Sequence, residues 1–131
     1  MNQLLQDLNL PRRPMGYLSA PMSAPDALTR AKHRFLALDA SHHLWEAEIL
    51  HYCPMANAPI IGTSDVHYEV WMAMDLEVLR RCDYILLVGE WGTSAGCRRE
   101  LAMARSLGKP VVFNVEDAIT LDRELLGRIV S

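Results

Sequence analysis

The chain has 131 residues, and half of them are hydrophobic, which suits one compact domain with its own core. Its formal net charge is −3, so it lacks the basic excess typical of proteins that bind nucleic acids. No apolar run approaches the roughly 18 residues that span a membrane, and residues 1–14 lack the pattern of a signal peptide. The sequence therefore predicts neither a nucleic-acid polymer nor a membrane as its partner.

Cysteine and histidine usage bears on the compartment and on cofactors. The three cysteines, Cys53, Cys82 and Cys97, form no CxxC motif, which indicates a reducing compartment and not a disulfide framework or a zinc knuckle. The five histidines show no metal-ligand spacing, and neither GxGxxG nor GxxxxGK[ST] occurs. We therefore expect a cytoplasmic protein (in the host cytoplasm if a phage encodes it) that needs no metal and no cofactor.

The first half of the chain predicts two strands and one long helix. Residues 1–15 are predicted to form an arm or a short helix, and residues 16–20 a short buried strand. A helix follows over about 25–43, and residues 48–53 predict a second strand. The loop over 54–65 is long enough to be functional. The helix is expected to bury the apolar residues that recur at helical spacing, which are Ala27, Leu28, Ala31, Phe35 and Leu38.

The second half continues the alternation of helices and strands. Its predicted elements are a helix over 66–82, a strand over 84–88, a helix over 96–107, a strand over 111–115 and a helix over 121–130. The run YILLV at 84–88 is typical of a strand covered on both faces. The alternation predicts a single α/β domain over 16–131, a flavodoxin- or Rossmann-like three-layer sandwich with a four- to five-stranded, mainly parallel sheet.

Two acidic residues fall on the apolar faces of predicted helices. At 100° per residue, Asp75 lies in the middle of the apolar stripe of helix 66–82, and Glu100 lies in that of helix 96–107. Burying an ionised carboxylate costs several kcal/mol unless it is paired or hydrogen-bonded. Such placements often mark function, although a buried partner or a half-exposed helix edge explains them equally well.

The predicted topology gives Glu100 a position suited to chemistry. Open parallel sheets bind ligands at the carboxyl ends of their strands, where helix 96–107 begins. The helix dipole there favours an ionised carboxylate, which is a competent nucleophile when desolvated. Ser94 and Gly96 lie at the same helix start, where a hydroxyl and free backbone N–H groups suit a phosphate, or where Ser94 simply caps the helix. The loop Ser19–Ser23 is expected to wall this pocket.

Several of these segments resemble the nucleoside 2-deoxyribosyltransferase superfamily. They are DLEVLRRCD at 75–83, YILLV, SAGCRRE at 94–100 and GKP at 108–110, with YLSAPM resembling the first strand and its phosphate-side loop. The 2′-deoxynucleoside 5′-monophosphate N-hydrolases and cytidylate N-glycosidases of that superfamily share S-x-G-x-x-x-E and an earlier aspartate, here 100 − 75 = 25 residues before the glutamate. The resemblance covers residues 16–115, and the pattern is similar to that of small phage-type and bacterial members.

The resemblance implies a role for each matching residue. Glu100 is implied to attack the anomeric carbon, and Asp75 to act as general acid and base towards the leaving base or the incoming water. Tyr17 is implied to position Glu100 or the sugar. The residues implied to bind the phosphate or to line the sugar-phosphate side are Ser94, Gly96, Ser19 and Met22.

The chain also departs from the pattern of the monophosphate hydrolases. Arg98 and Arg99 stand where those enzymes tend to have a small residue and an aromatic, so each is either a phosphate contact or a solvated side chain. Trp91 either stacks on a base or forms a hydrophobic lid. Members of the superfamily usually complete their pockets from a neighbouring subunit, which implies a homodimer or a higher homo-oligomer.

The sequence thus predicts an N-glycosidase that acts on a (deoxy)nucleoside 5′-monophosphate and releases a free base and a sugar phosphate. Transfer of the deoxyribose to another base, cleavage of NAD, a non-catalytic nucleotide-binding or sensor module and a small assembly protein stay open as alternatives. Carboxyl groups about 5–6 Å apart favour catalysis by analogy with retaining glycosidases. Carboxyl groups held in structural ion pairs favour the binding module.

Overall fold

The computed structural model describes residues 12–57 and 68–130. Within these residues, four parallel strands form one sheet in the order β2-β1-β3-β4. The strands are β1 (Gly16–Ser19), β2 (His51–Tyr52), β3 (Tyr84–Leu87) and β4 (Val111–Val112). The helices are α2 (Ala27–Glu46), η2 (Pro54–Asn57), α4 (Tyr68–Arg81), η4 (Trp91–Thr93), α5 (Ala95–Ser106) and α6 (Val115–Val130). Most of the predicted N-terminal arm lies outside the described residues and stays a prediction.

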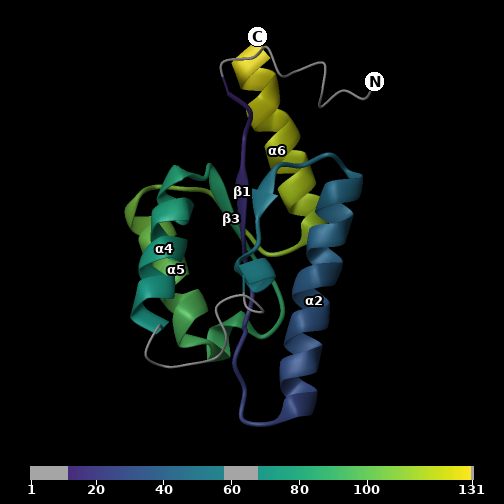
Figure 1. Cartoon of the computed structure of the whole chain (residues 1–131). Coiled ribbons are helices and arrows are strands. Elements are labelled where there is room, and N and C mark those ends of the chain that lie inside the picture. Colours follow the sequence, from purple (N-terminus) through teal and green to yellow (C-terminus); the bar gives the residue numbers. More distant parts are fainter. Residues whose placement is uncertain (1–11, 58–67, 131) are drawn as a thin grey trace.

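Side-chain alternation along the strands divides the core into two layers. Tyr17 and Ile85 point towards α4 and α5, whereas Leu18 and Leu86 point towards α2 and α6. Successive side chains of a strand face opposite ways, so a strand covered on both faces needs apolar residues throughout. Figure 1 shows α4 and α5 on one side of β1 and β3, and α2 and α6 on the other. The predicted three-layer α/β fold of flavodoxin or Rossmann type is therefore confirmed.

The central strand β1 positions the residues of interest. Tyr17 lies in register with Tyr52 of β2, and its neighbour Gly16 lies in register with Tyr84 of β3. A Cβ atom added at Gly16 would come within 2.6 Å of the Tyr84 ring, so only glycine fits beside that ring. Because alternate residues share a face, Tyr17 and Ser19 both point towards α4 and α5 at the carboxyl end of the strand.

Helix α2 buries a different face from the one predicted. Asp26 caps the helix by accepting a hydrogen bond of 2.8 Å from the backbone N–H of Thr29, so the helix begins after it and continues past the predicted end. The side chains of Leu28 and Phe35 are 67% exposed, so the predicted apolar face is wrong. The helix buries a mixed set of small and larger side chains instead. They are His33, Ala37, Ala40, Ser41 and Leu44.

Two further boundaries differ from the predictions for local reasons. Glu48 adopts a positive φ of 61° that turns the chain out of α2, so β2 is shorter than the predicted 48–53. Asn114 accepts a hydrogen bond of 2.8 Å from the backbone N–H of Asp117 and so starts α6 at Val115, earlier than predicted. Asparagine is a favoured N-cap, and acidic residues in the first turn suit the helix dipole. The strand predicted just before this helix is shortened accordingly.

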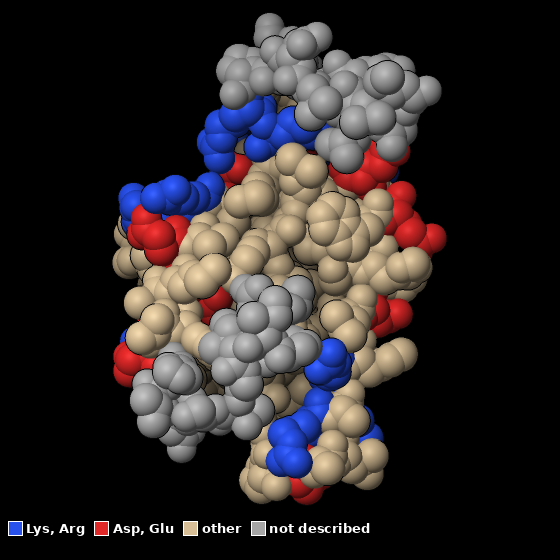
Figure 2. Space-filling view, viewed as in Figure 1, with Lys and Arg blue, Asp and Glu red and all other residues tan. Residues whose placement is uncertain are grey.

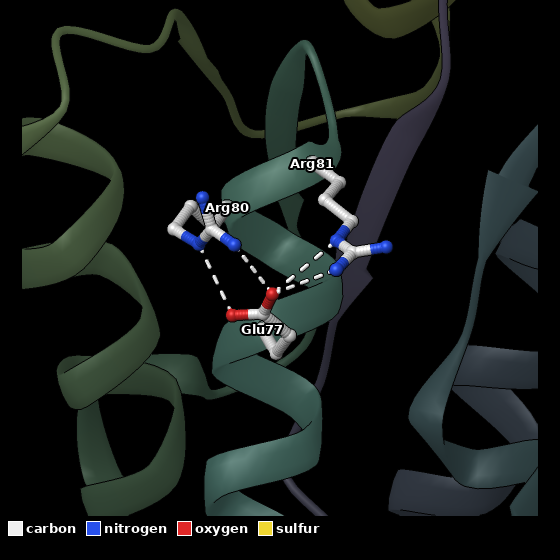
Figure 3. A network of polar contacts seen from close by, with 3 residues as sticks. All are labelled: Glu77, Arg80 and Arg81. Atoms are coloured by element: carbon white, nitrogen blue, oxygen red, sulfur yellow. Dashed lines mark hydrogen bonds and ion pairs between the residues drawn. The ribbon is translucent and has the colours of Figure 1, made fainter.

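Helix α4 separates a charged face from a buried one. Figure 3 shows Glu77 on its outer side between Arg80 and Arg81, with the Arg80 Nε and Arg81 Nη2 groups each donating at 3.0 Å. Hydrogen bonds from these two guanidinium groups hold the pKa of Glu77 at about 2. Such exposed pairs stabilise a fold little, but they mark the solvent face. Met72 and Leu79 are buried on the other side, as the spacing predicts.

The described surface shows no concentrated charge on the face seen in Figure 2. There, Lys and Arg residues lie in separate groups, mainly near the upper and lower ends of the view, with Asp and Glu residues close to them. Among the described helices, none combines the length and the apolar content needed to cross a bilayer.

Candidate functional site

Glu100 lies at the centre of the candidate site, on α5 and only 5% exposed. The hydroxyl of Tyr17 donates a hydrogen bond to its Oε2 atom, and Ser19 Oγ donates to its Oε1 atom at 2.8 Å. Both donors come from the same face of β1, as the alternation of the strand requires. The structure thus brings together three of the residues that the sequence singles out.

The electrostatics of Glu100 reflect burial opposed by hydrogen bonding. Burial raises the pKa of Glu100 to about 7, the hydroxyls of Tyr17 and Ser19 lower it by stabilising the ionised form, and the charge of Asp75 raises it. Burial, together with the neighbouring carboxylate, also raises the pKa of Tyr17 far above its ordinary value. Tyr17 therefore stays a neutral donor, while Glu100 exchanges its proton near neutral pH.

Asp75 supplies a second carboxyl group beside Glu100. It is half-buried on α4, and the hydroxyl of Tyr52 donates a hydrogen bond of 3.3 Å to its Oδ1 atom. Burial raises the pKa of Asp75 to about 6, and the bond from Tyr52 acts in the opposite direction. In the part of the chain that the structure describes, neither Asp75 nor Glu100 forms an ion pair. Neither acid is therefore held as a structural salt bridge there.

Tyr17 and Tyr52 link the two carboxyl groups through the sheet. They are register partners on β1 and β2, and their ring centroids lie 5.7 Å apart at an angle of 38°. Each tyrosine donates to a different acid, Tyr17 to Glu100 and Tyr52 to Asp75. The connected cluster therefore has one residue from each of two adjacent strands and one from each of two adjacent helices.

The start of α5 combines a cap with free donors. Ser94 Oγ accepts a hydrogen bond of 3.2 Å from the backbone N–H of Cys97, so Ser94 is the N-cap. The backbone N–H groups of Ala95 and Gly96 have no partner among the described residues. A Cβ atom at Gly96 would make only ordinary contacts of 3.8 Å or more, so packing within the chain does not require glycine. Two free N–H groups and the helix dipole suit an anion.

The two arginines of α5 both have partners within the chain. Arg98 Nη1 donates to the carbonyl oxygen of Gly92 at 2.8 Å, which braces η4 against the start of α5. Arg99 forms an ion pair of 3.2 Å with Glu69 and so connects α5 to α4. Both side chains are exposed, and the structure brings neither of them to the carboxyl groups by a hydrogen bond.

Trp91 and Met22 lie at the margins of this cluster. The Trp91 ring stacks on Phe113 with a centroid distance of 5.7 Å and an angle of 27°. Phe113 directly follows β4, at the opposite edge of the sheet from β2, which carries the partner of Asp75. Trp91 therefore packs towards the β4 edge of the sheet, whereas Asp75 is bonded from the β2 edge. Met22 is half-buried in the loop after β1.

Three residues near the carboxyl groups are not among the predicted site residues. The Tyr52 hydroxyl donates a hydrogen bond to Asp75. The sequence gives no sign of this contact, because it depends on the pairing of Tyr52 with Tyr17 on the neighbouring strand. Cys97 lies close to the hydroxyls of Ser19 and Ser94, and burial raises its pKa. Its spacing of three residues from Glu100 is a usable signal, because such residues share a helix face. The indole N–H of Trp71, one helical turn before Asp75, is buried without a partner among the described residues.

Residues 17–113 match the model of a family described as a domain of unknown function (DUF4406). The matched range runs from the Tyr17 that bonds Glu100 to the Phe113 that stacks on Trp91, so it contains every residue of the cluster. None of the curated proteins matches the chain. Because the family model covers well over half of its length, the chain belongs to the DUF4406 family.

Proposed function

We propose that this protein is an N-glycosidase that hydrolyses a (deoxy)nucleoside 5′-monophosphate to a free base and a sugar phosphate. One observation carries the proposal: Glu100 is buried and held by two hydroxyl donors next to Asp75, a second acid of raised pKa. The resemblance of the sequence to the nucleoside 2-deoxyribosyltransferase superfamily supplies the reaction class. Two neighbouring carboxyl groups are what a retaining glycosidase requires, and the reactive form is the singly protonated pair in which Glu100 is ionised and Asp75 carries the proton.

In the first step, a carboxylate oxygen of Glu100 forms a bond to C1′ of the sugar while the C1′–N bond to the base breaks. The electron pair of the breaking bond moves to the base nitrogen, which takes a proton from Asp75. The transition state resembles an oxocarbenium ion, and the negative charge of Glu100 stabilises it until the ester forms.

In the second step, water attacks C1′ from the side that the base has left. The Asp75 carboxylate takes one proton from this water, the new C–O bond forms, and the ester bond to Glu100 breaks. Both acids return to their starting states, so the net change is nucleotide plus water to base plus sugar phosphate. If another base takes the place of water, the same intermediate gives deoxyribosyl transfer.

The remaining residues would orient the substrate. The N–H groups of Ala95 and Gly96, which have no partner within the described ranges, support binding of the 5′-phosphate at the start of α5. Because Asp75 protonates the base, the base should leave on the side of β2, where Tyr52 lies. Trp91 stacks on Phe113, which follows β4 at the other edge of the sheet, and this favours the lid over the base-stacking hypothesis.

We further propose that the protein is a homo-oligomer that acts in the cytoplasm. The exposed apolar side chains Leu28, Phe35 and Leu38 of α2 give a second copy a surface to cover, and a groove there is lined by Ala31, Lys32, Phe35 and Leu36. Monomeric proteins rarely expose large contiguous apolar patches. A nucleotide substrate suits the reducing cytoplasm, and so do cysteines that form no disulfide with one another in the described part of the chain.

The test is chromatographic detection of base release from nucleosides, ribo- and deoxynucleoside monophosphates and NAD, with and without an acceptor base. Glu100→Gln should abolish release. Asp122→Asn is the matched control, because Asp122 is also a buried carboxyl bonded to a tyrosine (Tyr84 Oη to Oδ2, 2.7 Å) but lies on the opposite face of the sheet. Release that persists in Glu100→Gln, or is equally lost in Asp122→Asn, would overturn the assignment. Nucleotide binding without any release would instead favour the sensor module.

A further inference from the structure

The two tyrosines of the cluster occupy equivalent positions on neighbouring strands. Tyr17 and Tyr52 are register partners in a parallel pair, so their side chains leave the sheet on the same face. Each hydroxyl bonds one acid, and the acids belong to the adjacent helices α5 and α4. The spacing of the acids is therefore tied to the spacing of two strands and does not depend on helix packing alone.

Strand spacing has a value that suits the proposed reaction. Adjacent strands lie about 4.8 Å apart, and the ring centroids of Tyr17 and Tyr52 lie 5.7 Å apart. Retaining glycosidases hold their two carboxyl groups roughly 5–5.5 Å apart. A pair of tyrosines in register, with one acid on each hydroxyl, therefore anchors the two carboxyl groups to neighbouring strands.

We propose that Tyr52 is a positioning residue of this site, which holds Asp75 at a fixed spacing from Glu100 and controls the release of its proton. The proposal rests on the proposed function for its catalytic meaning. Tyr52 does not touch the reacting atoms in this scheme. It acts through Asp75, as Tyr17 acts through Glu100.

The groups that face Asp75 make Tyr52 its main polar partner. In the described part of the chain they are Tyr52 from β2, Tyr17 from β1 and Glu100 from α5. Tyr17 is committed to Glu100, and Glu100 repels the charge of Asp75. The Tyr52 hydroxyl is thus the group that stabilises ionised Asp75, against the effect of burial.

This balance fixes the direction in which the pKa of Asp75 changes when the Tyr52 hydroxyl is removed. Without the donor, burial acts on Asp75 unopposed, and its pKa rises above about 6. Asp75 then keeps its proton to higher pH. Because the pKa of Asp75 lies below that of Glu100, it is the acid limb of the activity profile that moves to higher pH. Because Asp75 also loses its anchor, fewer bound substrates meet it in a productive geometry, and kcat falls while KM changes little.

The deciding experiment follows the side-chain carboxyl carbon of Asp75 by NMR across pH in the wild type, Tyr52→Phe and Tyr84→Phe. Tyr84→Phe is the matched control, because it removes the hydroxyl that bonds Asp122 on the opposite face of the sheet. We expect the Asp75 midpoint to rise by about one pH unit in Tyr52→Phe and to stay unchanged in Tyr84→Phe. An unchanged midpoint in Tyr52→Phe, or the same rise in both variants, would overturn the inference.

Kinetics separate this inference from the proposed function. If the wild type releases base, Tyr52→Phe should lower kcat about tenfold, keep KM within about twofold and move the acid limb of the activity profile to higher pH. A fall in kcat with an unmoved limb would reduce Tyr52 to a core residue. If no substrate releases base, the proposed function fails, and the Asp75 titration still decides whether Tyr52 controls that proton.

Discussion

Three carboxyl groups, those of the buried Glu100 and Asp122 and of the half-buried Asp75, make the stability of this protein depend on pH. Burial raises their pKa values to about 6, 7 and 6, whereas an unfolded chain titrates them near 4. Between these limits the folded state binds more protons than the unfolded state. The stability that these groups contribute is therefore fully present below about pH 4 and is lost as the pH rises through their folded-state values.

Glu100→Gln should accordingly stabilise the protein at pH 8 while it abolishes catalysis. The raised pKa of Glu100 corresponds to a cost of up to about 3 kcal/mol for keeping the carboxylate ionised in the fold. The glutamine amide keeps the shape of the side chain without that charge. The gain in stability is reduced by the cost of rearranging one hydrogen bond. Thermal unfolding at pH 4 and at pH 8 checks this expectation. An equal change in Tm at both pH values would contradict it.

The sequence predicts some of these residues better than others. Helical spacing alone turns Asp75 and Glu100 inward, because their apolar neighbours recur at the same angle. The sequence does not identify Tyr52 as a site residue, because its strand is too short to show an alternation. Its partner Tyr17 is known only from strand pairing. The sequence likewise does not predict the stacking of Trp91 on Phe113, because this contact depends on where β4 ends.

At the scale of the element, the start of α5 carries a cap and a candidate phosphate site on the same residue. Ser94→Asp separates the two roles. Aspartate caps a helix as well as serine does, so the free energy of unfolding should change by less than about 0.5 kcal/mol. Its negative charge repels a phosphate, so KM for the 5′-monophosphate should rise by about tenfold or more.

The control for Ser94→Asp is the same variant acting on the nucleoside that lacks the phosphate. Its KM should stay near that of the wild type, because no phosphate charge approaches the helix. A rise in KM for both substrates would show that the variant distorts the site, and a monophosphate KM that stays unchanged would remove Ser94 from the phosphate subsite. Unfolding measurements on Ser94→Ala give the reference for loss of the cap, which should lower the free energy of unfolding by about 1 kcal/mol.

Helix α2 shows how far periodicity can predict a buried face. Leu28, Phe35 and Leu38 do share a side of the helix, but that side looks away from the sheet. The sheet-facing side carries Ala37 and Ala40, whose small size has no strong periodic signal. Spacing identifies which residues lie together, whereas the choice of face is settled by packing with segments far away in the sequence.

At the scale of the whole molecule, the exposed face of α2 predicts self-association. Phe35→Glu places a charge in the middle of that face and should convert an oligomer into monomers, as measured by light scattering after size-exclusion chromatography. Thr120→Glu on the exposed side of α6 is the control with the same added charge. A wild type that is monomeric at micromolar concentration, or a Phe35→Glu variant that keeps the wild-type mass, would contradict this expectation.

The layer order of the molecule follows from the alternation of elements, and this much the sequence predicts correctly. Apolar runs such as 84–88 require cover on both faces, and helices between parallel strands provide it. The sequence does not predict that α6 begins as early as Val115, because a single cap at Asn114 decides it. Local polar contacts of this kind override propensity at the ends of elements.

The contact between Gly16 and Tyr84 has a consequence for how this family can vary. Any side chain at Gly16 collides with the Tyr84 ring, and a smaller residue at position 84 gives up the hydrogen bond to Asp122. A tolerated change at Gly16 thus demands compensating changes at Tyr84 on β3 and Asp122 on α6. Across homologous sequences, positions 16, 84 and 122 are expected to covary as a set, next to a Tyr17 that remains constant.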